Sequence, residues 1–287
     1  MLTRRSFLRW LWGGFLLSLS PFSASGALGD LIPTIRQRRS RSIAESFSGE
    51  ELVYEIGFWL FKRVALGRLS FRATENRGRY LAILETETLG ILGWVSRYRV
   101  DTYRSIMEET EEGTRLRSLS FEEDVKIGNR NEKRVTQFDY ERRKWTTLKW
   151  RKNGSIQRIE EDIPPGRFYD DFLTAAYNFR YGVYGPVERG KVYTVPTFPR
   201  KGSTSYEVRV ASREEEEKRR RSEKVRDQKE FFLKLKMDAE ITHSREGRIE
   251  GWLSKDFLPV EGTLKDVLLF GDVRGTLIGN NKHSSES

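Results

Sequence analysis

The sequence predicts a mainly β protein, in which a curved antiparallel meander or half-barrel wraps one central helix at about residues 167–181. Three observations indicate this fold class. Short segments that alternate apolar and polar residues recur along most of the chain, with short connections between them. Helical periodicity is clear in the segment 163–181. Aromatic residues make up 12% of the chain, which suits sheets whose inner faces carry large side chains.

The composition excludes several kinds of chemistry. The 287 residues suffice for one β-rich domain with a full core, and we expect that domain to span residues 49–279. The chain has no cysteine, which excludes disulfides, thiolate metal sites and cysteine nucleophiles. Its two histidines are His243 and His283, so we expect no metal and no cofactor. The net charge of +10 would favour anionic surfaces, but a basic soluble protein is the simpler interpretation, and we expect no nucleic-acid partner.

Residues 1–26 are predicted to be an export signal peptide. Arg4, Arg5, Phe7 and Leu8 belong to a segment that resembles the twin-arginine signal motif, and an apolar run follows it. That run is short for a membrane span, so cleavage is the expected outcome. The general secretory route and an uncleaved N-terminal anchor are the alternatives. We therefore expect a periplasmic protein whose mature form does not span a membrane.

A linker and a series of strands follow the signal. Residues 27–48 are polar, Ser-rich and basic, and are predicted to be a linker. Strands are then expected at 52–58, 67–72, 80–85, 97–103, 116–121, 135–140, 145–150 and 156–159. Asn153-Gly154, between the last two, is the strongest hairpin turn signal in the chain.

The central helix has recognisable start and stop signals. Pro164, Pro165 and Gly166 end the preceding strand, Asp171 is the predicted N-cap, and Gly182 is the predicted stop. The expected buried face carries Phe172, Ala175, Ala176 and Phe179.

Further strands close the domain after the helix. They are expected at 191–196, 206–210, 231–241, 248–254 and 258–264. Residues 212–230 carry blocks of opposite charge without apolar periodicity, which predicts a charged hairpin extension. Residues 280–287 are predicted to be a disordered tail.

Four short motifs lie in a fixed order along the domain. They are the opening Gly49-Glu50-Glu51-Leu52-Val53-Tyr54-Glu55, the turn Ile163-Pro164-Pro165-Gly166, the pair Asp171 and Arg180, and Trp252-Leu253-Ser254-Lys255-Asp256 with Leu258-Pro259-Val260. In this order the chain resembles the exported bacterial proteins grouped as domain of unknown function 3108, over about 49–279. It departs from that family in a longer segment at 58–67 and in its charged run. The resemblance implies a periplasmic β protein and no particular reaction.

Two aspartates and one arginine of the helix are candidate site residues. Asp170 and Asp171 are adjacent carboxylates beside aromatic residues, and such a pair can share a proton for acid–base chemistry. Adjacent residues at a helix start point to different faces, however. We therefore expect Asp171 to cap the helix, Asp170 to face solvent, and Arg180 to pair with a strand residue and fix the helix on the sheet.

The aromatic residues suggest a binding surface. An unclosed sheet curled around a helix leaves a concave apolar surface of the kind that shelters acyl chains, a comparison made at the level of fold alone. The candidate lining residues are Trp59, Trp94, Trp145, Trp150 and Tyr177. The alternative for each of them is a place in the ordinary core.

The leading hypothesis is a non-enzymatic exported protein that binds a hydrophobic or amphipathic envelope component, such as a lipid, or an envelope protein partner, between sheet and helix. Burial of apolar ligand surface would hold such a component without catalytic groups. Two other classes stay open. One is a hydrolase or transferase that acts on cell-wall or glycan material through carboxylates such as Asp170 or Asp256. The other is a structural adaptor for an envelope protein complex.

Overall fold

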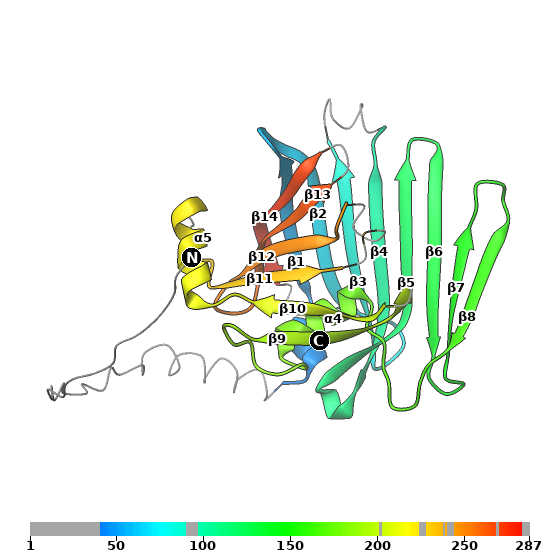
Figure 1. Cartoon of the computed structure of the whole chain (residues 1–287). Coiled ribbons are helices and arrows are strands. Elements are labelled where there is room, and N and C mark those ends of the chain that lie inside the picture. The colour runs from blue at the N-terminus through cyan, green and yellow to red at the C-terminus, as the bar shows by residue number, and fades with distance from the viewer. Residues whose placement is uncertain are drawn as a thin grey trace, which may run out of the picture.

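The protein is built on one antiparallel sheet of fourteen strands (Figure 1). The computed structural model describes residues 41–89, 97–200, 203–223, 228–237, 239, 244–267 and 270–282. The strands are β1 (Glu50–Phe58), β2 (Phe61–Ala73), β3 (Arg79–Thr88), β4 (Val100–Thr110), β5 (Arg115–Ile127), β6 (Arg130–Asp139), β7 (Lys144–Trp150), β8 (Ile156–Asp162), β9 (Val192–Arg200), β10 (Ser203–Val210), β11 (Phe231–Lys236), β12 (Arg248–Leu253), β13 (Pro259–Val267) and β14 (Gly271–Lys282).

The sheet consists of two meanders joined at the middle. Strands β1 to β8 pair in chain order, as do β9 to β14, and β1 pairs with β14. The sheet stays open, with β8 and β9 as its edges. It curls far enough that Phe198 of β9 packs against Phe138 of β6 and Trp145 of β7, with ring centroids 5.4 and 5.8 Å apart. The predicted fold class, a curved and unclosed antiparallel meander, is confirmed.

Helix α4 (Phe172–Tyr181) lies within the curl (Figure 1). It is shorter than predicted because Asp171 has extended backbone and caps the helix, so residues before it are not helical. Gly182 ends the helix with a φ of 94°, a left-handed conformation that glycine adopts without strain. Apolar clusters from both meanders surround the helix, with Phe121, Leu173 and Tyr177 in one and Phe179, Val195 and Phe231 in another.

The buried surface of α4 is wider than the predicted stripe. Tyr177, Asn178 and Arg180 are buried as well as Ala175 and Phe179, whereas Phe172 is half-buried and Ala176 is exposed. A helix enclosed by a curled sheet contacts protein on most sides, so one apolar stripe underestimates its burial.

The predicted linker at 27–48 is wrong at its C-terminal end. Helix α2 (Ile43–Phe47) begins there, with Ser42 and Glu45 forming a capping box. Ile43, Ala44 and Phe47 are buried in the core beside α4. These three apolar residues therefore make the segment part of the domain. Residues 1–40, including the signal residues Arg4, Arg5, Phe7 and Leu8, lie outside the described part of the chain.

Two other predicted segments also need correction. The charged hairpin extension at 212–230 contains helix α5 (Arg213–Glu223), which lies between β10 and β11. Acidic residues in its first turn and basic residues in its last turn complement the helix dipole, and buried Glu216 binds it to the sheet. The predicted tail at 280–287 is wrong for its first three residues, because Asn280, Asn281 and Lys282 pair with β1, and residues 283–287 lie outside the described part of the chain.

Candidate functional site

Asp171 fastens the start of α4 to two strands. Its Oδ1 accepts hydrogen bonds from the N–H groups of Leu173 and Thr174, at 2.9 and 3.1 Å. Its Oδ2 accepts hydrogen bonds from the hydroxyls of Ser105 on β4 (2.5 Å), Ser118 on β5 (2.8 Å) and Thr174 (2.8 Å). Asp171 is thus the N-cap, and it also fixes the position of the helix on the sheet.

Asp170 is buried, contrary to the prediction that it faces solvent. The chain folds back beside β9, where the N–H of Asp170 donates to the carbonyl of Pro196. Its Oδ2 accepts hydrogen bonds from Arg115 (3.0 Å), Asn178 (3.1 Å) and Tyr184 (2.5 Å). Burial nevertheless raises the pKa of the Asp170 carboxyl.

The two aspartates form separate networks. Oδ2 of Asp171 binds hydroxyls of β4, β5 and α4, while Oδ2 of Asp170 binds arginine, asparagine and tyrosine side chains. Burial raises the pKa of Asp171 as well. Oδ1 of Asp170 has no hydrogen-bond partner among the described residues. These hydrogen bonds hold α4 and the loop before it against the sheet. No hydrogen bond joins the two carboxylates within the part of the chain that the structure describes.

Arg180 anchors the other end of α4. Its Nη1 and Nη2 donate to the two carboxylate oxygens of Glu50 on β1, at 2.7 and 2.6 Å, and its Nε donates to the carbonyl of Phe257. The Arg180 guanidinium also lies 4.6 Å from the ring centroid of Phe47 in α2. Arg180 therefore pairs with a strand residue and holds the helix on the sheet, as the sequence indicated.

The candidate aromatic residues do not line one cavity. Trp145 and Tyr177 belong to the core, with 3% and 0% of their surface exposed. Trp59 is 86% exposed at the β1–β2 turn, and Trp150 lies at the end of β7. Trp94 lies outside the described residues. The predicted shared groove is wrong for the four described residues, because α4 and core side chains fill the concave face that was expected to be open.

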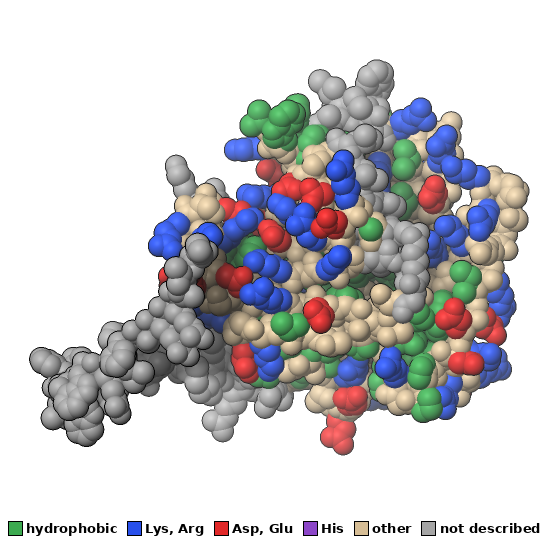
Figure 2. Space-filling model, viewed as in Figure 1, with side chains coloured by type: hydrophobic (Ala, Val, Ile, Leu, Met, Phe, Trp, Pro, Cys, Tyr) green, Lys and Arg blue, Asp and Glu red, His purple; other side chains and the backbone are tan. Residues whose placement is uncertain are grey.

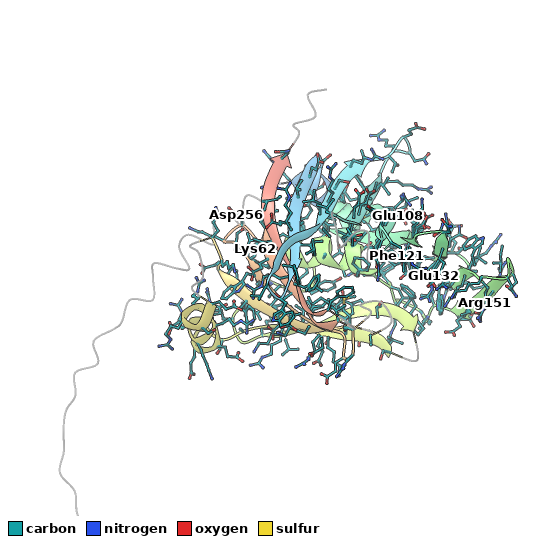
Figure 3. The ribbon with its side chains drawn as sticks, turned by 90° about the horizontal axis from the view of Figure 1, so that it is seen from above. Lys62, Glu108, Phe121, Glu132, Arg151 and Asp256 are labelled. Carbon is teal, nitrogen blue, oxygen red and sulfur yellow. The ribbon has the colours of Figure 1, made fainter. Side chains whose placement is uncertain are left out.

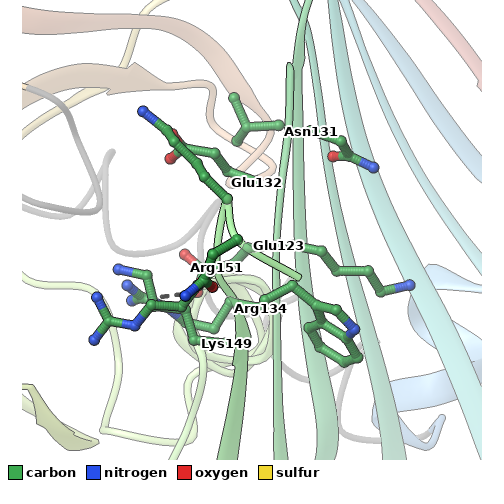
Figure 4. Close-up of a pocket in the computed structure, with 11 residues that line it drawn as sticks. Glu123, Asn131, Glu132, Arg134, Lys149 and Arg151 are labelled. Carbon is green, nitrogen blue, oxygen red and sulfur yellow. Dashed lines mark ion pairs between the residues drawn. The ribbon is translucent and has the colours of Figure 1, made fainter. Parts of the chain in front are cut away.

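A groove does open elsewhere, between two hairpins of the sheet (Figure 4). The β6–β7 pairing stops at Arg134 and Lys149, whereas β5–β6 continues to the Ile127–Arg130 pair. The β5–β6 and β7–β8 hairpins therefore separate beyond this point. The groove has a volume of about 450 Å³, within the range usual for small-molecule sites. It is lined by Glu123, Val125, Asn131, Glu132, Lys133, Arg134, Lys149, Trp150, Arg151, Lys152 and Asn153.

The groove combines an aromatic wall with an excess of positive charge. Five cationic side chains and two acidic ones line it. Arg134 pairs with Glu123 at 3.7 Å, and the Lys133 ammonium lies 5.8 Å from the Trp150 ring centroid (Figure 4). Within the described chain, Lys149, Arg151 and Lys152 form no ion pair with a carboxylate. Lys149 and Trp150 are adjacent in β7, so their side chains leave the strand on opposite faces of the sheet. Arg151 donates a hydrogen bond to the amide oxygen of Gln157. Cations without a carboxylate partner thus flank the groove from both faces and are available to an anionic group bound between the hairpins.

The sequence carries one signal for this groove. Lys149, Arg151 and Lys152 stand on both sides of Trp150, directly before the Asn153-Gly154 turn. That turn predicted a hairpin, and the hairpin is confirmed. What the turn could not reveal is the divergence of two neighbouring hairpins, because divergence depends on where the β6–β7 pairing ends.

The carboxylates proposed for catalysis lie outside the groove. Asp170 is buried beside α4, and Asp256 is exposed in the turn before β13. No group of three or more His, Asp or Glu residues in the described ranges could hold a metal ion. None of the helices in those ranges has both the length and the apolar character needed to cross a membrane.

Comparisons with known proteins place the chain beside others without a described activity. The family model described as "Protein of unknown function (DUF3108)" matches residues 53–277. No curated protein matches the chain. Among solved structures, a beta-barrel-like protein of domain of unknown function DUF1849 from Brucella abortus is 12% identical, with a TM-score of 0.41 over 82% of this chain and 98% of that one.

Proposed function

The chain belongs to the DUF3108 family, and we propose that this member is an exported, periplasmic protein that binds an amphipathic envelope molecule with an anionic headgroup. The groove beside Trp150 is the proposed site. Binding there would be non-catalytic, by burial of apolar surface against the indole ring and by ion pairing with the surrounding lysines and arginine.

Export is proposed from the N-terminal sequence. Arg4 and Arg5 precede an apolar run that ends in small residues, the order of a secretory signal. A protein carried across the inner membrane by such a signal meets phospholipids and other anionic amphipaths in the envelope. The chemistry of the proposed ligand therefore matches the proposed location in the periplasm.

The single observation that carries the proposal is the composition of the groove. Trp150 provides apolar contact on one face of the sheet and Val125 on the other, while Lys149, Arg151 and Lys152 provide charge without a carboxylate partner in the described part of the chain. Apolar walls with a few convergent polar groups are the usual make-up of small-molecule sites. An amphipath with a phosphate headgroup would satisfy both halves of this lining.

The enzyme hypothesis has less support from the positions of its residues. Acid–base catalysis needs a carboxylate within hydrogen-bond reach of a bound substrate. Asp170 and Asp256 do not line the groove. Glu123 and Glu132 do line it, and Arg134 pairs with Glu123.

A titration with a short-chain, monomeric phosphatidylglycerol tests the proposal. We expect saturable binding by the full chain and a loss of affinity of about tenfold or more for the Lys149→Glu, Lys152→Glu double variant. An exposed ion pair contributes up to about 1 kcal/mol, and each charge reversal adds repulsion. Phosphatidylcholine of the same chain length should bind more weakly.

Arg142→Glu is the matched control for charge reversal. Arg142 is exposed in the turn between β6 and β7, at the end of those strands that lies away from the groove. Its substitution should leave the affinity unchanged. Binding that does not saturate, or equal affinity of wild type and the double variant, would contradict the proposed site.

A further inference from the structure

The β1–β2 hairpin ends in an exposed apolar tip, which we define as residues 58–63. Trp59 and Leu60 form the turn and are 86% and 84% exposed, and Phe61 is 51% exposed. Figure 2 shows a hydrophobic cluster projecting at the top of the molecule, where Figure 1 places the β1–β2 hairpin. Adjacent large apolar residues rarely remain this exposed without a binding partner.

The local backbone is shaped to present these side chains. The β1–β2 register shifts between Ile56 and Phe58, and a Cβ on Gly57 would lie 2.7 Å from the carbonyl oxygen of Phe61. Glycine therefore allows the close approach that bends the hairpin. Trp59 has a φ of 51°, a conformation unusual for a bulky residue. Tryptophan at this position points to a role outside the protein's own core.

Aromatic contacts support the tip from below. Phe58 lies 5.6 Å from Phe61 and 5.1 Å from Phe270 of the β13–β14 turn, measured between ring centroids. Phe58 is half-buried and Phe270 is 38% exposed. The tip is thus a defined projection on the sheet and not an isolated turn.

Positive charge accompanies the apolar side chains. Lys62 and Arg63 are exposed within the tip, and neither forms an ion pair with any described residue. The neighbouring β3–β4 connection is tied to β2 by a hydrogen bond from the N–H of Leu89 to the carbonyl of Val64. It carries exposed Arg97 and Tyr98, the latter 58% exposed.

The same end of the sheet carries further cations. Alternating strand directions bring the β1–β2, β3–β4, β5–β6 and β7–β8 connections to one end of the sheet (Figure 1). Arg130 is exposed at the start of β6, and Arg151 and Lys152 are exposed in the β7–β8 connection. In Figure 3, which looks down on this end, Lys62 and Arg151 lie toward opposite sides of the molecule. Exposed basic side chains thus lie at each of these four connections, while Glu132 is exposed beside the β5–β6 turn and Asp266 and Asp272 flank the β13–β14 turn.

We propose that the tip docks the protein onto the surface of an anionic lipid bilayer, with Trp59, Leu60 and Phe61 in the interfacial region and Lys62 and Arg63 on lipid phosphates. Aromatic side chains favour the membrane–water interface, and basic residues are attracted to anionic headgroups. A stable protein–protein interface needs about 800 Å² on each partner with complementary shape. A narrow convex tip offers little such surface, whereas a bilayer needs no complementary pocket.

Arg151 and Lys152 belong both to this end of the sheet and to the groove, but the tip residues do not line the groove, so the docking proposal can be tested separately. It accounts for apolar exposure, for the bent hairpin and for the charge beside it. A bound bilayer would face the hairpin end of the sheet, while α2 and the β2–β3 turn would face away.

The absence of cysteine allows a local test of docking. In the full chain, Leu60→Cys can carry an environment-sensitive fluorophore at the tip. Ile278→Cys is the matched control, because Ile278 is 56% exposed on β14, well along the strand from the hairpin end. The probes are vesicles of phosphatidylglycerol mixed with phosphatidylethanolamine, compared with vesicles of phosphatidylcholine alone.

We expect the Leu60 label to shift to the blue and brighten on the anionic vesicles, and the Ile278 label to stay unchanged. Reversal of both cations, Lys62→Glu with Arg63→Glu, should weaken the anionic-vesicle response by at least about tenfold, because each basic side chain contributes separately to headgroup attraction. Because the signal is local, attachment of the chain through its N-terminal segment alone would not produce it.

Three results would overturn the proposal. The first is an unchanged Leu60 label on protein that floats with the vesicles. The second is an equal response of both labels. The third is a Leu60 signal that rises with protein concentration without lipid, or on addition of an envelope protein fraction from which lipid has been removed, since a second copy or a protein partner would then be the occupant.

Discussion

Asn178 shows that a polar residue on a helix need not mark the solvent face. Its Oδ1 accepts from the N–H of Leu116 at 3.0 Å, and its Nδ2 donates to the carbonyl of Leu116 at 2.9 Å and to Oδ2 of Asp170 at 3.1 Å. Sequence periodicity favoured an apolar stripe and could not predict the pairing with Leu116, because Leu116 lies on a strand 62 residues away in the sequence. The amide is fully buried.

Asn178→Ala should lower the free energy of unfolding by about 3 kcal/mol or more. The substitution leaves the backbone groups of Leu116 and one lone pair of Asp170 without a partner, and each buried unsatisfied group costs about 1–3 kcal/mol. Urea denaturation measures the loss. Ala176→Gln, at an exposed position of the same helix, should change stability by less than about 1 kcal/mol. Similar losses for the two variants would show that Asn178 is not held as described.

Asp170 should make stability depend on pH. Its folded-state pKa is raised above the unfolded value of about 3.9, so the folded protein binds the proton more tightly. Its contribution is therefore greatest at low pH and declines as pH rises from about 4 through the raised pKa. Asp170→Asn cannot titrate, and the unfolding free energy measured across this window should decline less in the variant. An identical pH dependence would contradict the raised pKa.

At the scale of elements, start and stop signals were predictable and burial was not. Helix α4 begins after Asp171 and ends at Gly182, as the sequence indicated. Ser42 and Glu45 have the spacing of a capping box, yet the polar composition around them hid α2. The blocks of opposite charge in α5 predicted a solvated hairpin. In the structure, however, Glu216 of this helix accepts hydrogen bonds from Arg189 at 2.6 Å and from the N–H of Phe232 at 3.1 Å. Long-range partners decide each of these cases.

The Arg180–Glu50 pair should be the strongest single tie between α4 and the sheet. Arg180→Ala or Glu50→Ala should each cost about 3–5 kcal/mol, because either change leaves a buried charge without its partner. The double variant should lose much less than the sum of the two. Thermal or urea unfolding of the four proteins in a double-mutant cycle measures the coupling, and strictly additive losses would contradict a direct pair.

At the scale of the whole molecule, the meanders follow from the sequence but their junction does not. Short turns predicted neighbouring antiparallel strands on either side of α4. The β1–β14 pairing joins residues more than two hundred positions apart, and no local signal specifies it. The groove at Trp150 forms because two hairpins diverge, and the tip at Trp59 forms because of a register shift in β1–β2. The sequence shows neither feature. Trp150 and Trp59 were therefore expected to share one cavity, but they lie in different places.

Export is a property of the whole chain and has its own test. Arg4→Lys with Arg5→Lys keeps the positive charge but removes the guanidinium pair. If the twin-arginine route is used, the precursor should stay in the cytoplasm, as fractionation and immunoblotting would show. Arg9→Lys, which leaves that pair intact, should be exported normally. Normal export of the double variant would leave the general secretory route.

The central claim is that the protein holds an anionic amphipath in the Trp150 groove, and native mass spectrometry of protein isolated from the cell envelope tests it most directly. We predict that wild type carries a bound lipid with an anionic headgroup, that Arg142→Glu carries the same species, and that Lys149→Glu with Lys152→Glu has lost it. No bound species on wild type, or the same species on all three proteins, would contradict the claim.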